Sequence, residues 1–262
     1  MAKPTRIIAI VNQKGGVGKT TTTINLAAAL TLRGKKVLLI DLDPQGNAAT
    51  GLGIPRASRD VTVYDIFVDE ASIEAASMVT SVEGLSLVPS HMDLAGVELE
   101  LGDRAGRTTI LQRALDAVQG EYDYVLIDCP PSLNLLTVNA LTAARSVVVP
   151  LQCEFFALEG LSQLLQTVEM AKAQINPALV IDGVIMTMYD KRNRLSAQVA
   201  ADVRKHLGRA VFKTIIPRNV RIAEAPSFGK PVLNYAPSSA GSKAYIALAD
   251  EVLTRHARAV KK

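Results

Sequence analysis

A glycine-rich segment near the start of the chain constrains the fold more than any other feature. It reads Gln-Lys-Gly-Gly-Val-Gly-Lys-Thr over residues 13–20, between an apolar stretch at Arg6–Asn12 and a helix-compatible stretch at Lys19–Leu32. A strand, a glycine loop and a helix in this order predict a phosphate-binding loop, because glycines let backbone N–H groups converge on phosphate oxygens and the helix start adds partial positive charge. We therefore expect an α/β fold with a nucleotide site at the end of its first strand.

The loop residues divide into backbone donors and side-chain ligands. Lys19 is expected to reach the β and γ phosphates, Thr20 to offer its hydroxyl to Mg²⁺, and Thr21 to add a phosphate contact. The loop positions expected to bind the nucleotide beside them are Lys14, Gly15, Gly16, Val17 and Gly18. A glycine-rich turn without a ligand is the alternative, and the Gly-Lys-Thr placement disfavours it.

The loop departs from the usual pattern at its start. Such loops usually begin with glycine, whereas Gln13 occupies that position and Lys14 follows it. This second lysine is a cation that the phosphates of one nucleotide do not obviously need. It is therefore interpreted as serving a second nucleotide or a transition state.

Two later apolar segments end in carboxylates. Lys36–Asp41 is followed by Leu42 and Asp43, and Tyr124–Asp128 ends in a single aspartate. Because parallel strands present their carboxyl ends at one sheet edge, these side chains are expected to face the phosphate loop. Asp128 is predicted to anchor Mg²⁺ directly or through water, while the earlier pair orients an attacking water or holds hydrated Mg²⁺. The alternative for Asp43 is that it only begins a turn with Pro44.

Apolar segments of four to eight residues alternate with longer helical patterns along the chain, which predicts one doubly wound, mainly parallel sheet with helices on both faces. The 262 residues are expected to form a single domain. The layout of 44–84 is poorly determined, with short helical candidates at 63–67 and 73–78. The expected strands are 6–12, 36–41, 85–89, 124–128, 146–151, 180–188 and 211–216, and the main helices 19–32, 108–118, 133–143, 158–175, 196–207 and 242–262.

Composition places the chain among ordinary globular proteins, with 48% apolar and 21% charged residues. No apolar run approaches the roughly 18 residues that span a bilayer, and no cleavage site follows the start, so a cytoplasmic protein without a membrane partner is expected. Cys129 and Cys153 lie far apart and outside any zinc-binding spacing, which favours reduced thiols. A reactive or cluster-binding role stays open for Cys129, which directly follows Asp128.

Positive charge is concentrated in one segment. From Lys191 to Lys230 ten Lys and Arg residues face only Asp202 and Glu224, an excess of +8, whereas the whole chain carries +4 and the remainder therefore −4. Few aromatic residues interleave these cations, which favours contact with the phosphate backbone of duplex DNA over reading of single strands. A merely solvated basic face is the alternative.

Three motifs together resemble the deviant Walker A ATPases of the ParA/MinD superfamily. They are Lys-Gly-Gly-Val-Gly-Lys-Thr at 14–20, Asp-Leu-Asp-Pro-Gln-Gly-Asn at 41–47 and Asp-Cys-Pro-Pro-Ser at 128–132. The segments Pro-Leu-Gln-Cys-Glu at 150–154, Ala-Leu-Glu-Gly-Leu at 157–161 and Ile-Pro-Arg-Asn-Val-Arg at 216–221 narrow the resemblance to chromosomal ParA proteins of the Soj type. The resemblance covers nearly the entire chain.

The resemblance implies ATP and Mg²⁺ as ligands, a weak intrinsic ATPase activity that the partner and DNA stimulate, and an ATP-bound sandwich dimer. In such a dimer Lys14 crosses to the phosphates of the other subunit, Gly15 lies where the subunits close, and Asp43 supports hydrolysis together with Lys19. The remaining implied positions are Pro217 and Asn219 near the adenine, and Arg192 and Arg221 in contact with DNA beside Arg218 of the same basic segment.

The resemblance also implies partners and a place of action. The dimer binds double-stranded DNA nonspecifically at the nucleoid, and a centromere-binding ParB-type protein stimulates ATP turnover and releases it. The chain starts almost at its first strand, so operator-specific repression through an N-terminal helix-turn-helix extension is not expected. The alternatives are a MinD-like membrane-positioning ATPase, a metabolic enzyme such as an iron–sulphur reductase or an amidoligase, and a nonenzymatic DNA scaffold.

Overall fold

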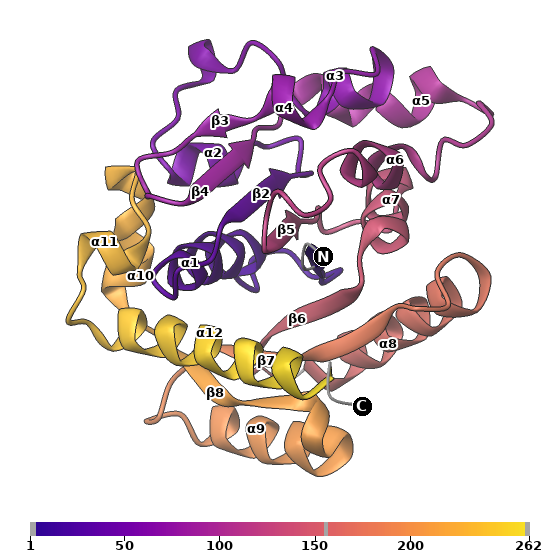
Figure 1. The fold of residues 1–262 in the computed structure, drawn as a ribbon. Helices are drawn as coiled ribbons and strands as arrows, with labels where there is room; N and C mark the ends of the chain where they lie inside the picture. Colours follow the sequence, from indigo (N-terminus) through magenta and orange to yellow (C-terminus); the bar gives the residue numbers. More distant parts are fainter. Residues whose placement is uncertain (1–3, 155–156, 260–262) are drawn as a thin grey trace.

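The described residues, 4–154 and 157–259, form one eight-stranded sheet in the computed structural model of the chain (Figure 1). The strand order is β3-β4-β2-β5-β1-β6-β7-β8, and every neighbouring pair is parallel except β3 and β4. The mainly parallel sheet expected from the sequence is thereby confirmed. The strands are β1 Arg6–Ile10, β2 Val37–Asp41, β3 Met78–Val79, β4 Leu85–Val88, β5 Tyr124–Asp128, β6 Ser146–Gln152, β7 Val180–Tyr189 and β8 Val211–Pro217.

Helices cover both faces of this sheet, because successive strand residues point to opposite sides. In β1, Ile7 and Ala9 pack into one apolar core, whereas Ile8 and Ile10 pack into the other. The first core is closed by α3, α4, α5, α6, α7, α8 and α9, and the second by α1, α2, α11 and α12. Strands buried on both faces read as continuous apolar runs, which is why the sequence marked them clearly.

The helices lie largely where the periodicity predicts them. None within the described part of the chain is long and apolar enough to span a bilayer. Their bounds are α1 Lys19–Thr31, α2 Asn47–Gly51, α3 Val63–Val68, α4 Ile73–Ala76, α5 Val97–Leu101, α6 Ile110–Asp116, α7 Leu135–Ala143, α8 Ala157–Gln174, α9 Arg194–Leu207, α10 Val220–Glu224, α11 Val232–Tyr235 and α12 Ala240–Ala259, with short 3₁₀ turns η1 Arg56–Ser58, η2 Met92–Gly96, η3 Gly208–Ala210 and η4 Ala225–Phe228.

One difference from expectation is at the β3 edge of the sheet. A helix was expected over 73–78, but α4 ends at Ala76, and Ser77 is extended with a ψ of 128°. Met78 and Val79 then pair antiparallel with Leu87 and Ser86. Two residues are too few to show a period of two, so a strand this short leaves no pattern in the sequence.

Candidate active site

The loop from β1 to α1 is a backbone cradle. Gly16 and Gly18 have φ values of 74° and 87°, and Gly18 in this left-handed conformation caps the amino end of α1. Residues with a Cβ adopt such values only with strain, so these positions favour glycine. A Cβ built on Gly15 or Gly16 meets no atom within 4 Å. The N–H groups at the start of α1 are therefore open to an anion.

Contacts from distant strands hold this loop in place. The side-chain amide of Asn12 donates to the carbonyl of Pro150 at 2.7 Å, and its oxygen accepts from the N–H of Lys14 at 2.9 Å. The hydroxyl of Thr187, on β7, donates to the carbonyl of the buried Val17 at 2.8 Å. The cradle is thus fixed from β6 and β7 by bonds that need no ligand.

Lys19 lies inside the loop that carries it. Its side chain is buried, and Nζ donates to the carbonyl of Lys14 at 3.1 Å. Burial lowers the pKa of Lys19, while the nearby carboxylates of Asp128 and Asp43 oppose that shift. A buried ammonium in this position favours a negatively charged ligand, because such a ligand compensates the lost hydration.

Asp128, at the end of β5, presents a carboxylate oxygen without a partner. Its side chain is fully buried, Oδ1 accepts from the hydroxyl of Thr23 at 3.0 Å, and Oδ2 has no hydrogen bond within the described structure. Burial raises the pKa of Asp128 to about 6, against the hydroxyls of Thr20 and Thr23. An orphaned buried oxygen beside a threonine hydroxyl suits Mg²⁺, which prefers oxygen ligands and commonly takes only one or two from the protein. The fit supports Thr20 and Asp128 as its anchors.

Asp41 and Asp43 follow the same strand but have different environments. Asp41 is fully buried, and its oxygens accept from the backbone N–H groups of Asp43, Ala48 and Ala49 at 3.2, 3.0 and 3.4 Å. Burial and the charge of Asp128 raise the pKa of Asp41 well above its ordinary value. Asp43 is only half-buried, and it faces the pocket above the phosphate loop. Asp41 therefore holds the loop that carries Asp43, and Asp43 is the carboxylate that a ligand can meet.

A pocket of about 300 Å³ brings most of the expected residues together. Lys14 is not one of its lining residues: its exposed side chain forms an ion pair of 2.8 Å with Glu154, and both side chains are 49% exposed. The pocket is lined by Gly15, Gly16, Gly18, Lys19, Thr20, Thr21, Asp43, Asn47, Pro131 and Met188. The two lysines of the loop thus point to different environments, one to the pocket and one to the surface.

Several lining residues were not expected from the sequence. Asn47 and Pro131 belong to motifs already noted, so their position within those motifs was the available signal. Met188 has a φ of 51°, which is unusual for a residue with a side chain. No sequence pattern marks such a methionine. Pro217, at the end of β8, and Asn219, which caps α10, do not line this pocket.

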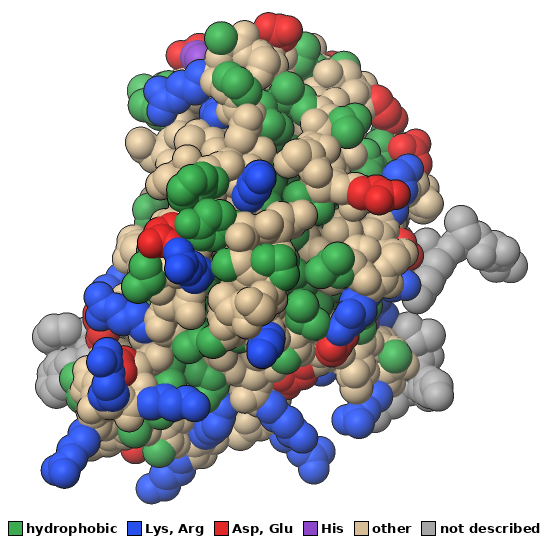
Figure 2. Space-filling view, turned by 90° about the vertical axis from the view of Figure 1, so that its left-hand side faces the viewer, with side chains coloured by type: hydrophobic (Ala, Val, Ile, Leu, Met, Phe, Trp, Pro, Cys, Tyr) green, Lys and Arg blue, Asp and Glu red, His purple; other side chains and the backbone are tan. Residues whose placement is uncertain are grey.

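The basic residues lie at the β7–β8 end of the sheet. Figure 2 shows Lys and Arg side chains gathered over the lower part of the molecule, where Figure 1 places β8 and α9. Arg192 is paired with Asp190 at 3.1 Å and Arg221 with Glu224 at 2.9 Å. The exposed guanidinium of Arg218 forms no hydrogen bond or ion pair with the described residues, but its charge lies near enough to Asp190 to help lower the pKa of that carboxyl. The three predicted DNA contacts therefore lie in one region, but only Arg192 and Arg221 form ion pairs within the described structure.

The cysteines show no sign of reactivity. Both are free and buried, and burial raises the pKa of Cys153 to about 11 and that of Cys129 further. A buried neutral thiol is a poor nucleophile and metal ligand. Among the described residues no group of three His, Cys, Asp or Glu side chains is placed to hold a metal ion by itself. Cys129 is therefore best explained as part of the core.

Comparison with known proteins adds to this geometry. Residues 5–181 match a family model described as an AAA domain. The chain is 59% identical over 256 residues to the chromosome partitioning protein ParA of Caulobacter vibrioides, which covers 97% of this chain and 96% of that one. It is 55% identical over 247 residues, 94% of this chain and 98% of the other, to the sporulation initiation inhibitor protein Soj of Bacillus subtilis.

A solved structure shares the fold along almost the whole length. It is described as cobyrinic acid a,c-diamide synthase from Mycobacterium smegmatis with bound ATP analog and magnesium. The TM-score is 0.84 at 42% identity, with 97% of this chain and 96% of that chain covered. The identity to the two partitioning relatives is higher than the identity to this synthase.

Proposed function

The chain belongs to the ParA family of chromosome-partitioning ATPases, and on this premise we propose that it is a two-subunit switch that binds DNA when ATP closes the pair. It is a magnesium-dependent ATPase of chromosome partitioning. One observation carries the proposal: Lys19 and Asp43 line one pocket at the phosphate loop, the buried carboxylate of Asp128 lies near enough to act on the charge of Lys19, and Lys14 points away to the surface.

The chain's own residues bind and orient the triphosphate. Backbone N–H groups of the glycine loop hold the phosphate oxygens, and Lys19 exchanges the carbonyl of Lys14 for a phosphate. Asp43 orients the attacking water. Thr20 and Asp128 would hold magnesium, which would neutralise charge on the phosphate oxygens. Since this chemistry needs little covalent help from protein, a slow intrinsic turnover that awaits a partner protein is expected.

The surface position of Lys14 supports the participation of a second subunit. Its ammonium is tied to Glu154 by an exposed ion pair, which is worth about 0–1 kcal/mol at most sites. Exchange of this pair for the phosphates of a second copy's nucleotide therefore costs little and gains a stronger charge-assisted contact. Gly15, exposed beside it, permits close approach of the two copies because it carries no side chain.

The finer assignments belong to the same proposal. Pro217 and Asn219 contact the adenine, while Arg192, Arg218 and Arg221 contact the backbone of double-stranded DNA without reading its sequence. A ParB-type protein stimulates hydrolysis and so releases the dimer from the nucleoid. The basic segment supports the DNA contacts by its charge and by its clustering at one end of the sheet.

Sedimentation and DNA binding with ATP, ADP and no nucleotide test the switch. We expect a dimer and tight duplex binding only with ATP and Mg²⁺, and neither with Lys19→Ala, which removes the phosphate-binding ammonium. Asp43→Ala is expected to form the dimer and stay on DNA longer, because hydrolysis is slowed. A chain that remains a monomer with saturating ATP and Mg²⁺, or binds DNA equally without nucleotide, contradicts the proposal.

A further inference from the structure

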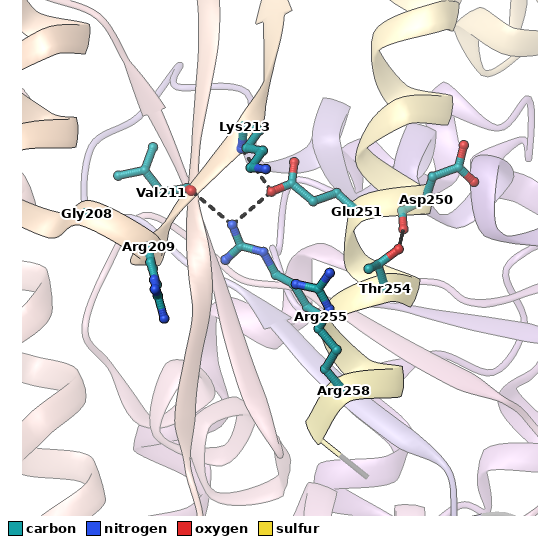
Figure 3. A pocket seen from close by; sticks show the side chains of 9 residues that line it. All are labelled: Gly208, Arg209, Val211, Lys213, Asp250, Glu251, Thr254, Arg255 and Arg258. Carbon is teal, nitrogen blue, oxygen red and sulfur yellow. Dashed lines mark hydrogen bonds and ion pairs between the residues drawn. The ribbon is translucent and has the colours of Figure 1, made fainter. Parts of the chain in front are cut away.

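A groove of about 910 Å³ lies between α12 and β8, which is the last strand on its side of the sheet. Figure 3 shows its side chains: Arg255 reaches from α12 toward the strand, Arg258 extends from the last turn of α12 beside it, and Arg209 extends from η3 on the other side of the strand. The full lining is Gly208, Arg209, Val211, Lys213, Asp250, Glu251, Thr254, Arg255 and Arg258. The groove is therefore rich in both signs of charge.

The acidic residues of the groove are already paired with other groups of the chain. Both oxygens of Asp250 accept from the guanidinium of Arg33, at 2.6 and 2.7 Å. The carboxylate of Glu251 accepts from Arg255 at 2.9 Å and from the backbone N–H groups of Lys213 and Thr214 at 2.9 and 3.0 Å. Burial raises the pKa of Glu251, but these N–H donors outweigh burial, so the net pKa is lowered and the group stays ionised.

Three cations of the groove have no such compensation. The exposed side chains of Arg209, Lys213 and Arg258 have no hydrogen bond or ion pair to any residue that the structure describes. Arg192 and Arg221, by contrast, are each held by a neighbouring carboxylate. An anion that approaches the groove meets free charge, whereas an anion at the other two arginines must first displace an acidic side chain.

The edge strand itself is closed to a pairing partner. Glu251 occupies the N–H groups of Lys213 and Thr214, and Arg255 donates to the carbonyl of Val211 at 2.9 Å. Arg204 donates to the carbonyl of Lys213 at 3.2 Å. A peptide that adds to this edge as a further strand would lose these bonds, so the groove is suited to a ligand that meets side chains.

We propose that Arg209, Lys213 and Arg258 form a phosphate-backbone contact site for duplex DNA, additional to Arg192, Arg218 and Arg221. The inference rests on the DNA binding proposed above and names where the uncompensated charge for it lies. Free, exposed cations release counterions from duplex DNA without breaking an internal ion pair, which makes them effective and sequence-independent contacts.

The position of the groove separates it from the nucleotide. β8 is parallel to β7, β6 and β1, and the phosphate loop follows the carboxyl end of β1. The groove lies around Val211, at the amino end of β8. It is therefore near the amino ends of the parallel strands, whereas the phosphate loop is at their carboxyl ends. The cations of the groove are present whether or not ATP is bound, so pairing of two copies doubles their number on one assembly rather than creating them.

The test compares two triple variants with the same loss of charge. Arg209→Gln, Lys213→Gln and Arg258→Gln empty the groove of free cations, while Lys35→Gln, Arg56→Gln and Arg113→Gln remove three cations elsewhere. With ATP and Mg²⁺, duplex affinity is measured from low to high salt. We expect the groove variant to lose about 2–3 per subunit from the slope of log K against log salt, and therefore on the order of 10³-fold or more in the affinity of the dimer at 0.15 M salt. The control is expected to retain the slope.

Separate outcomes identify which idea fails. Without DNA, ATP turnover and dimer formation are expected to match the parent in both triple variants. Each single groove variant is expected to lower the slope by about 1 per subunit. A groove variant with the parent's slope and affinity overturns the inference and leaves the proposed function standing. A parent that binds no duplex with ATP overturns both. Binding of poly-glutamate that depends on the three cations, with duplex binding unchanged, would assign the groove to an acidic protein segment instead.

Discussion

At the scale of single residues, Asp41 and Asp43 are expected to have different roles: Asp41 stabilises the fold, and Asp43 acts in hydrolysis. Asp41→Ala would leave the N–H groups of Asp43, Ala48 and Ala49 without their buried acceptor. Because each unsatisfied buried donor costs about 1–3 kcal/mol, we expect the free energy of unfolding to fall by about 2–4 kcal/mol. Urea unfolding measures this, with Asp41→Asn as a control that keeps one acceptor oxygen. A loss below about 0.5 kcal/mol in the alanine variant would contradict the role.

Asp43→Ala, unlike Asp41→Ala, is expected to change catalysis rather than stability. Its side chain is half-buried and, among the residues that the structure describes, accepts one hydrogen bond, from the N–H of Gln45 at 3.0 Å. We expect a change in unfolding free energy of about 0.5 kcal/mol or less, and a fall in kcat of about 10²–10³ with ATP affinity retained. Steady-state hydrolysis and nucleotide titration separate the two effects. Equal kcat in the variant and the parent would remove Asp43 from the reaction.

Asp128 predicts a measurable pH dependence. Burial raises its pKa to about 6 in the folded chain, whereas an unfolded aspartate titrates near about 3.9. Between these values the folded chain binds more protons than the unfolded chain, so the contribution of this group to stability falls as pH rises from about 4 to 6. Asp128→Asn is expected to raise the free energy of unfolding at pH 7.5 by about 1–3 kcal/mol and to flatten that window, while ATPase activity falls. The same pH dependence in variant and parent would contradict this.

At the scale of elements, a close backbone contact joins the turn after α2 to the turn after η4. Gly229 has a φ of 62°, and a Cβ built on it lies 2.6 Å from the Cα of Gly53. Gly34 has a similar φ of 68° but nothing within 4 Å of an added Cβ. We expect Gly34→Ala to cost about 1 kcal/mol from the backbone alone and Gly229→Ala about 3 kcal/mol or more, because backbone atoms must also move. Thermal or urea unfolding of both variants gives the comparison, and equal losses would show that the contact can relax.

The elements also show what local sequence can and cannot predict. The phosphate loop and the strands around it were predicted because glycine placement and apolar runs are local signals. The contacts that position the loop join Asn12 to Pro150, Val17 to Thr187 and Lys14 to Glu154, more than 130 residues apart in each case. Such pairs depend on the order of strands in the sheet, which no single segment encodes. The separate roles of Asp41 and Asp43 were hidden for the same reason.

At the scale of the whole molecule, β7 links the nucleotide pocket to the basic end. Thr187 bonds to the carbonyl of Val17 in the phosphate loop, and Met188 lines the pocket. Arg192 follows four residues later, in the turn before α9. A shift of the loop on nucleotide binding therefore has a direct structural route to the cations at the sheet's end. The left-handed backbone of Met188, with a φ of 51°, places a conformational constraint within that route.

The strongest test at this scale asks in which subunit Lys14 acts. Lys14→Ala and Asp43→Ala are each expected to be nearly inactive alone. When equal amounts are mixed, half of the dimers pair one of each, and in these one site combines its own Asp43 with the Lys14 of the other subunit. We therefore expect ATPase activity to recover to about one quarter of the parent level. If Lys14 acts only on its own nucleotide, no site in the mixture is complete. Activity that stays at the sum of the two separate variants, with mixed dimers shown to form, would contradict the crossing of Lys14 between subunits.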